Sequence, residues 1–249
     1  MIKIFIGVLF CGLFAEAGDL LSLDTKVSYV SKYMWRGFDL LEGDPSIQPE
    51  ATLSFSETGL YLGVWASYGT KSKWDEWDEW DFYGGYATTF YENMIYAVEA
   101  DFGYTFFHYP NQNKYIDSQE IAVNLKFPSL LKLTSTRFIP YTGVSYSFAA
   151  HKNEVDQRGY WLKLGLNMEQ KISSLNENPF LIYIETFCND GAGSMQVESG
   201  FSHIATGIKT TFEVWGLGFT PSVNYQETLE DSVNKDNDFW YTLTASKAF

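Results

Sequence analysis

Hydrophobic and polar residues alternate along most of the chain, as they do in β-strands that bury only one face. In segment 94–108, for example, Tyr96 and Phe102 share one phase, whereas Glu99 and Asp101 share the other. Successive side chains of a strand point to opposite faces, so such a segment has one apolar and one polar face. Twelve segments of this kind are separated by turn-forming residues: 26–37, 47–56, 60–69, 79–91, 94–108, 118–127, 137–149, 159–170, 180–188, 202–214, 217–226 and 239–249. The pattern predicts an all-β chain of about twelve strands.

The last segment, 239–249, has the length and phase of a strand that crosses a bilayer within a closed barrel. Such strands have about 9–11 residues and alternate between apolar outward and polar inward positions. Phe239 and Tyr241 lie on the apolar face, and Lys247 departs from it near the end. Bacterial outer-membrane barrels typically end in an aromatic residue that the barrel-assembly machinery recognises, and the terminal Phe249 resembles that residue. An edge strand of a soluble β-sandwich is the alternative for this segment alone.

The connections support a barrel with both ends in the periplasm, because an even number of strands returns the chain to the side on which it started. Links that should be extracellular are long, whereas most of those that should be periplasmic are short. Two expected periplasmic links, 128–136 and 171–179, are longer than the others. A sheet in a membrane must close, because unpaired backbone groups find no water there. We therefore expect the first strand, 26–37, to pair with the last, 239–249.

The N-terminus reads as a secretory signal peptide. Lys3 precedes an apolar run at 4–14, and Ala15-Glu16-Ala17 provides a cleavage site. The prediction is a signal peptide at 1–17 and an outer-membrane barrel at 18–249. Cleavage removes one of the two cysteines, so the mature chain has no intrachain disulfide, and Cys188 is expected to be an inert packed thiol.

Composition and charge narrow the possible partners. Aromatic residues make up 18% of the chain, which suits a lipid-facing surface with interfacial girdles. The net charge of −14 argues against nucleic acid, whose phosphates require basic partners. The expected partners are therefore outer-membrane lipid and lipopolysaccharide together with the barrel-assembly machinery, and the oligomeric state stays open.

Four motifs in the first third of the chain resemble one family. They are Tyr-Met-Trp-Arg-Gly at 33–37, Asp-Pro-Ser-Ile-Gln at 44–48, Gly-Leu-Tyr-Leu-Gly-Val-Trp-Ala-Ser at 59–67 and Glu-Trp-Asp-Phe-Tyr-Gly-Gly-Tyr at 79–86. Their order and spacing resemble the TorF-like porins, an outer-membrane family of largely unknown function. The resemblance implies an outer-membrane barrel and a pore, and it implies no substrate.

Charged residues on the polar phase are candidates for lining a pore. They are Glu50, Glu99, Asp101, Glu120, Lys126, Lys163, Glu169, Lys209 and Glu213. Six are acids and three are bases, and rings of carboxylates favour cations. We predict a porin for passive diffusion of small polar solutes, with a mild preference for cations. The alternative is that these charges pair and close the lumen, which leaves a structural or ligand-binding barrel without transport.

An acidic, aromatic repeat occupies the second long link. It consists of Trp74, Asp75, Glu76, Trp77 and Asp78 and continues into the next strand. One hypothesis is a loop that collects cations or stacks on sugars. The alternative, which the sequence favours, is that the tryptophans anchor in the outer-leaflet interface while the acids are solvated or bridge to lipopolysaccharide.

Arg36 has two interpretations. In the first, Arg36 faces the lumen and pairs with acids such as Glu50 or Asp81. In the second, it forms a structural ion pair or an interfacial contact near the rim. The sequence favours the second interpretation.

A barrel enzyme is the less favoured class. Outer-membrane lipases and proteases need a Ser-His-acid or Asp-His set near the rim. The chain has three histidines, His108, His151 and His203, and no serine motif stands beside the last of them. We therefore predict no catalytic residues, no metal site and no cofactor.

Overall fold

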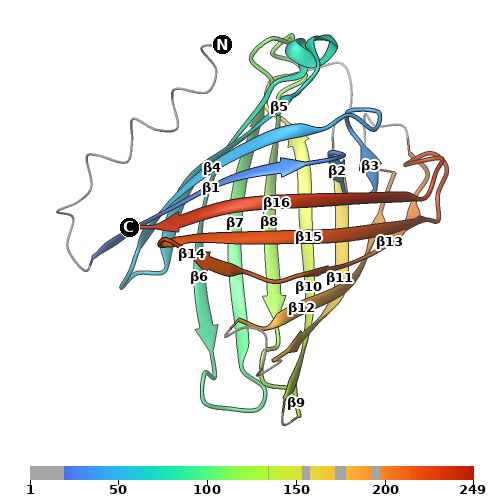
Figure 1. The fold of residues 1–249 in the computed structure, drawn as a ribbon. Helices are drawn as coiled ribbons and strands as arrows, with labels where there is room; N and C mark the ends of the chain where they lie inside the picture. The colour runs from blue at the N-terminus through green and yellow to red at the C-terminus, as the bar shows by residue number, and fades with distance from the viewer. Residues whose placement is uncertain (1–19, 134, 153–157, 172–177, 192–196) are drawn as a thin grey trace.

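Twelve long antiparallel strands close into a barrel in the part of the chain that the structure describes (Figure 1). The structure is a computed structural model, and it describes residues 20–249 except 134, 153–157, 172–177 and 192–196. The expected signal peptide lies outside the described residues. The long strands are β1 (Leu21–Val30), β4 (Ser46–Phe55), β5 (Leu60–Gly69), β6 (Glu79–Phe90), β7 (Val98–His108), β8 (Ser118–Lys126), β10 (Thr136–Ala149), β11 (Gly159–Gln170), β12 (Phe180–Asn189), β13 (Gly200–Lys209), β15 (Leu217–Thr228) and β16 (Asp238–Ala248).

The first and last long strands close the barrel, as predicted. β1 and β16 pair from Asp24 opposite Ala248 to Val30 opposite Thr242. Beyond the end of β16, the backbone N–H of Phe249 donates to the Leu23 carbonyl at 2.9 Å. Figure 1 shows these two strands side by side, with the C-terminus and the start of β1 at the same end of the barrel. We call this end periplasmic, because the connections at the opposite end are the longer ones.

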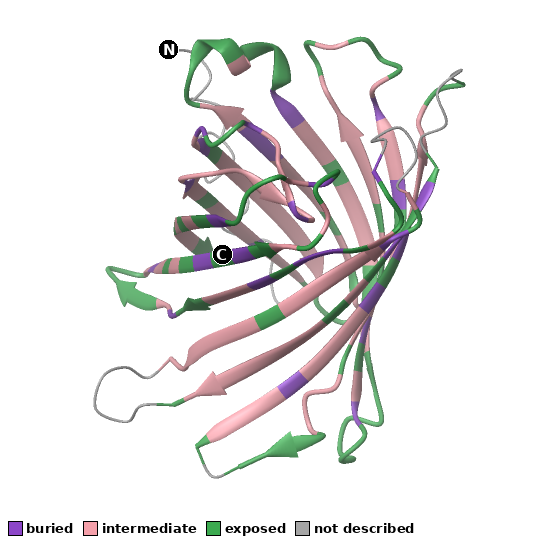
Figure 2. Cartoon of the chain, turned by 90° about the vertical axis from the view of Figure 1, so that its right-hand side faces the viewer, coloured by how far each residue is buried: buried purple, intermediate pink, exposed green. Residues whose placement is uncertain are grey.

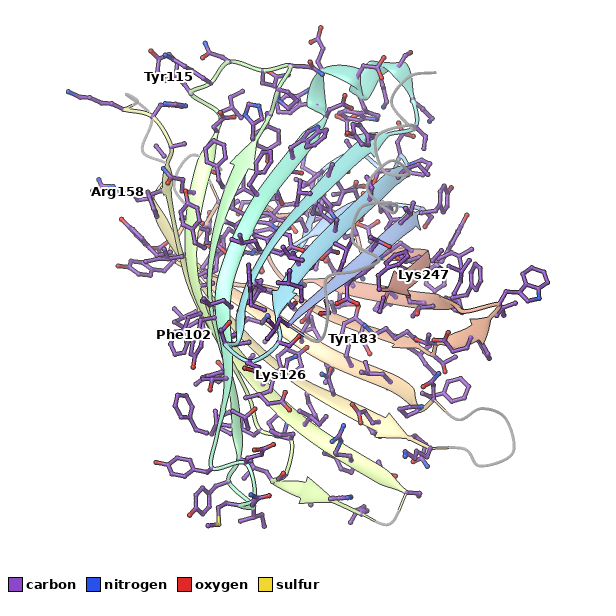
Figure 3. All side chains as sticks on the ribbon, turned by 90° about the vertical axis from the view of Figure 1, so that its left-hand side faces the viewer. Phe102, Tyr115, Lys126, Arg158, Tyr183 and Lys247 are labelled. Atoms are coloured by element: carbon purple, nitrogen blue, oxygen red, sulfur yellow. The ribbon has the colours of Figure 1, made fainter. Side chains whose placement is uncertain are left out.

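The outer face of the wall carries an apolar belt. Large exposed side chains on this phase include Leu62, Phe102, Leu164 and Leu243. Phe102 projects from the outside of the wall in Figure 3, and Figure 2 shows that few positions along the strands are buried. A barrel made of a single sheet, with an apolar outer face and a polar inner face, is typical of bacterial outer-membrane proteins. This chain therefore lies in the outer membrane.

The periplasmic rim contains the lysine that departs from the apolar pattern. Lys247, labelled in Figure 3, lies on the outward phase near the end of β16, and its Nζ atom is 4.7 Å from the ring centroid of Phe249. A lysine at this depth covers apolar surface with its stem while its ammonium group reaches the interface.

The structure corrects three predicted boundaries. The first strand ends at Val30 instead of Gly37, because the chain turns into the barrel and forms a short hairpin, β2 (Met34–Trp35) and β3 (Phe38–Asp39). The predicted strand 202–214 breaks after Lys209, and a separate β14 (Phe212–Val214) follows. The long link 128–136 contains a two-residue strand, β9 (Leu131–Lys132), which pairs with the start of β10.

The loop between β5 and β6 contains a short 3-10 helix, η2 (Ser72–Trp77). No helix of the described residues is long and apolar enough to cross a membrane.

Candidate functional site

Hydrogen bonds between side chains that skip a strand identify the inner face of the barrel. The Tyr83 hydroxyl on β6 donates to Glu50 on β4 at 2.8 Å, and the Tyr61 hydroxyl on β5 donates to Asp101 on β7 at 2.7 Å. On the other side of the barrel, the Tyr141 hydroxyl donates to Glu185 at 2.9 Å. The lumen is therefore polar, and several of its carboxylates are held against the wall by tyrosine hydroxyl groups.

These tyrosine rings lie over glycines of neighbouring strands. The ring of Tyr83 occupies the space that a Cβ atom at Gly63 would need, and the ring of Tyr141 does so at Gly165. Glycine in a strand marks a place where another group approaches the backbone closely. The absence of a side chain at these two positions allows the rings to lie flat against the wall.

All nine predicted pore-lining residues lie on the inward phase of the barrel. Eight lie on long strands, whereas Glu213 lies in β14, opposite Gly218 at the periplasmic end. The sequence pattern missed Glu185, because the residues around it in β12 are apolar on both faces. It also missed Lys26, which lies opposite Glu50 in the register of β1 and β4.

Three of the six predicted lumen acids are neutralised by bases outside the predicted set. Glu50 pairs with Lys26 at 3.0 Å, Glu120 with Arg36 at 2.6 Å and Glu169 with Arg137 at 2.6 Å. The acids without such a partner are Glu99, Asp101 and Glu213, which equal the three predicted bases in number. These pairings set three predicted acids against three bases outside the predicted set, but they leave the net charge of the lumen open, because Glu185 is an acid outside the predicted set as well.

The β2–β3 hairpin lies inside the barrel. Its two-residue turn consists of Arg36 (φ 50°) and Gly37 (φ 97°), which is the geometry of a type I′ turn. The turn contacts the wall at β15, two strands from β1, because the Gly37 carbonyl accepts a hydrogen bond from the Gln226 side chain at 2.8 Å. A Cβ atom at Gly37 would lie 2.6 Å from His203 Nδ1, so this position requires glycine for space as well as for conformation.

A buried ion pair fixes the hairpin tip. The Arg36 guanidinium donates to both oxygens of Glu120 on β8, at 2.7 and 2.6 Å, and Ser147 donates to the same carboxylate at 2.9 Å. The guanidinium also stacks 4.5 Å from the Trp35 ring and 5.1 Å from the Trp161 ring. Arg36 does face the lumen, but its partner is Glu120 instead of Glu50 or Asp81. Bidentate pairs of this kind are among the stronger hydrogen bonds in proteins.

Apolar residues surround the hairpin within the extracellular half of the barrel. Trp161 on β11 and the loop residues Val197 and Val233 form a buried cluster, on which Trp35 and Phe38 pack. The centroids of Trp35 and Trp161 are 5.7 Å apart, with an interplanar angle of 68°. The hairpin is thus a plug with its own small hydrophobic core, placed inside an otherwise polar lumen.

The acidic, aromatic repeat lies in η2 except for Asp78, which directly follows the helix, and it packs on other extracellular loops. The indole of Trp74 donates to Asp44 at 2.9 Å, and Lys73 pairs with Asp44 at 3.0 Å. Hydrogen bonds from Lys71, Trp74 and Lys73 lower the pKa of Asp44 from its ordinary value. The Trp77 ring contacts the Tyr109 ring at 6.5 Å. Asp75 and Glu76 use their backbone carbonyls to hold Asn111 and Gln112 at 2.7 and 3.0 Å, and a ligand role for the repeat stays a prediction.

The histidines form no Ser-His-acid set among the described residues, although two of them flank one carboxylate at the extracellular rim. Ser202 Oγ lies 2.9 Å from His203 Nδ1, but Ser202 is fully buried and the His203 ring stacks on Phe187 instead of meeting a carboxylate. At the extracellular rim, His108 contacts Asp117 at 3.1 Å, and His151 approaches the same carboxylate at 3.9 Å. No group of three or more His, Cys, Asp or Glu that could hold a metal occurs in the described part of the chain.

Comparisons with known proteins agree with this fold. Residues 15–248 match the family described as "Bacterial protein of unknown function (Gcw_chp)". An outer membrane channel from Pseudomonas putida F1 superimposes with a TM-score of 0.54 at 10% identity, covering 93% of this chain and 98% of that chain. The NanC porin gives a TM-score of 0.53 at 8% identity, covering 90% of this chain and 98% of that one. No curated protein matches the sequence. At such low identity the structural likeness establishes the barrel fold alone, and the specific resemblance to TorF-like porins stays a prediction.

Proposed function

We propose that this chain, which belongs to the bacterial Gcw_chp family of proteins of unknown function, is a porin for passive diffusion of small polar solutes. The observation that carries the proposal is a barrel in which the sheet closes on itself and the inner face carries polar and charged side chains. The fold shared with porins and channels supports it, and so does the resemblance of segment 33–86 to TorF-like porins.

The hairpin sets the narrowest part of the proposed path. It brings Trp35, Arg36 and Phe38 into the extracellular half of the lumen, where the Arg36–Glu120 pair spans from the hairpin to the wall. A solute that enters from outside must pass beside this plug. The proposal is therefore a narrow channel for small solutes instead of a wide general pore.

The hairpin also favours a second candidate function. Its apolar packing on Trp161 and Val233 is what a permanently closed barrel would show. In that case the barrel would serve as a structural or ligand-binding protein without transport.

Single-channel recording in planar bilayers distinguishes the two candidates. The native protein is compared with a variant in which residues 34–39 are replaced by a Gly-Ser linker of the same length. For a porin we expect discrete conductance steps in the native protein and larger steps in the variant. Conductance in the variant alone would favour the closed barrel, and silence in both would reject the porin.

Recordings in a salt gradient measure the charge preference of the same channel. The sequence-based prediction is a mild preference for cations, and the reversal potential gives its sign.

A further inference from the structure

Three adjacent strands bring side chains of both charges to one place on the inner wall, near the periplasmic end of the barrel. In the registers of β6, β7 and β8, Thr89 lies opposite Glu99, and Glu99 lies opposite Lys126. The neighbouring inward row consists of Ala87, Asp101 and Asn124. Residues directly opposite each other on one face of an antiparallel pair have Cβ atoms about 4.5–5.5 Å apart. The register therefore gathers a hydroxyl group, two carboxylates, an ammonium group and an amide in one small area of the lumen.

A cavity lies over these two rows. Its volume is about 400 Å³, and its lining includes all six residues. Ligand pockets in proteins have volumes of about 300–1,000 Å³, so this cavity suits a small molecule. Lys126, which Figure 3 labels, lies on the inner side of the wall from which Phe102 projects outward. The cavity therefore opens on the lumen, where a diffusing solute can reach it.

The two charges that face each other across β7 and β8 are not joined. Among the described residues, neither Glu99 nor Lys126 forms an ion pair within 4.0 Å. Lys26 and Glu50, which also face each other in the lumen, do form one at 3.0 Å. Glu99 and Lys126 are both exposed, and an ion pair between exposed side chains contributes little stability because each charge is also solvated. A solute can therefore lie between these two side chains at small cost.

Asp101 has a fixed orientation beside this pair. Its Oδ2 atom accepts a hydrogen bond from the Tyr61 hydroxyl at 2.7 Å, and its Oδ1 atom lies 3.5 Å from the Asn124 amide nitrogen. The Asn124 amide oxygen is turned the other way, over Gly143, where an added Cβ atom would lie 2.4 Å from it. A second carboxylate thus lies two residues from Glu99 on the same face of β7, with one oxygen held only by a long hydrogen bond.

We propose that this cavity is a weak binding site for small zwitterions of the amino-acid class. The ammonium group of the solute lies between Glu99 and Asp101, and its carboxylate lies beside Lys126. A simple cation at this place meets the like charge of Lys126 and a simple anion meets two carboxylates, whereas a zwitterion satisfies both signs. Conduction requires binding that is weak enough for the solute to leave, and exposed side chains provide it. The inference rests on the proposed porin function and names a solute class for it.

Saturation-transfer NMR on the detergent-solubilised protein tests the site directly, with glycine as the probe. Methylammonium and acetate serve as comparison probes, because each carries only one of the two charges of glycine. We expect the transfer of saturation from the native protein to glycine to be several-fold larger than the transfer to either comparison probe. Equal transfer to all three probes, or none to glycine, would overturn the inference.

Variants of the facing pair show whether the two charges carry the binding. Glu99→Gln and Lys126→Gln each remove one charge and should reduce the glycine signal several-fold. Glu57→Gln, in the turn between β4 and β5, and Lys132→Gln, in β9, remove the same charges outside the cavity and should bind like the native protein. The exchange Glu99→Lys/Lys126→Glu keeps both charges in one row and should bind glycine better than either reversal alone. A native-like glycine signal in both single glutamine variants would contradict the proposed site.

Bilayer recording with the same variants separates the site from the porin proposal. We expect glycine on the periplasmic side to reduce the potassium chloride current of the native channel, and the two glutamine variants to conduct without this effect. Glycine binding by a protein that forms no channels would reject the porin and support the site. Channels formed by a protein that shows no transfer to glycine would overturn the site and leave the porin intact.

Discussion

Arg36 reaches across the lumen from the hairpin tip and forms a bidentate ion pair with Glu120 on β8, at 2.7 and 2.6 Å. The two side chains are 14% and 7% exposed, so the pair is largely removed from water. The pair joins the plug to the wall, and its two residues are 84 positions apart in the sequence. Among the described residues, neither partner forms a second ion pair.

Replacing one partner should therefore do more harm than replacing both. Arg36→Ala leaves Glu120 buried without a counter-charge, and breaking a buried pair in this way costs about 3–5 kcal/mol. We expect a lower free energy of unfolding and, if the barrel conducts, larger and noisier current steps as the plug loosens. Arg36→Leu/Glu120→Leu should lose clearly less stability, which denaturant unfolding in detergent measures. Equal losses in the single and double variants would contradict the proposed role of the pair.

Gly37→Ala should destabilise the plug through contact as well as strain. An alanine at φ 97° is strained by about 1–2 kcal/mol, and its Cβ would also lie 2.6 Å from His203 Nδ1. Gly216 provides the matched control, because it has φ 73° with no atom within 4 Å of the added Cβ. We expect Gly37→Ala to lower the melting temperature more than Gly216→Ala, and the difference measures the fit of the hairpin against the wall. Indistinguishable melting temperatures would show that the turn has room to move.

Acid should release the loop that contains the tryptophan repeat. The pKa of Asp44 is lowered by hydrogen bonds from Lys71, Trp74 and Lys73. A carboxyl group with a lowered folded-state pKa contributes stability that is fully present above its unfolded pKa of about 3.9 and is lost as the pH falls below that value. We expect the indole N–H resonance of Trp74 in NMR spectra to be constant near neutral pH and to shift toward that of a free indole only in strong acid.

Asp44→Asn is the comparison for this titration. It removes the charge at every pH, so its Trp74 resonance should lack the acid transition that the native protein shows. A native transition centred near pH 6 would point to another group.

Deleting Phe249 should impair insertion into the outer membrane. The residue extends the β1–β16 seam, because its N–H donates to Leu23 at 2.9 Å and its carbonyl accepts from Leu23 at 3.2 Å. Phe249→Ala keeps these backbone bonds and removes the ring, so the two variants separate seam closure from recognition by the assembly machinery. Trp215→Ala, at a side chain that is 97% exposed, is the control. Heat-modifiable migration of membrane fractions reports insertion, and normal insertion of the deletion variant would mean that the terminal residue is dispensable.

Periodicity was sufficient to predict the barrel because the apolar phase is kept in almost every strand. The inward orientation of Lys163 or Glu120 can be predicted from the apolar residues on either side of it, since successive side chains of a strand point to opposite faces. The inward hairpin could not be predicted in this way. Tyr33 and Trp35 continue the alternation of β1, so the pattern runs on while the backbone turns at Arg36.

The pairing of lumen charges was equally beyond the sequence. Glu120 and Arg36 meet only because a segment that the pattern assigned to the wall folds into the lumen. Tyr141, whose hydroxyl donates a hydrogen bond to Glu185, lies two strands away from it. Distances across a barrel depend on its closure and tilt, and no local pattern encodes them.

The glycines under the lumen tyrosines also determine how wide the barrel is inside. At Gly63 and Gly165 a methyl group would displace the rings of Tyr83 and Tyr141 from the wall toward the axis. Gly63 and Gly165 therefore influence the inner width of the barrel by allowing the two rings to lie against the wall. An alanine at either position would leave the strand count and the lumen charges unchanged and would narrow the passage from the wall inward.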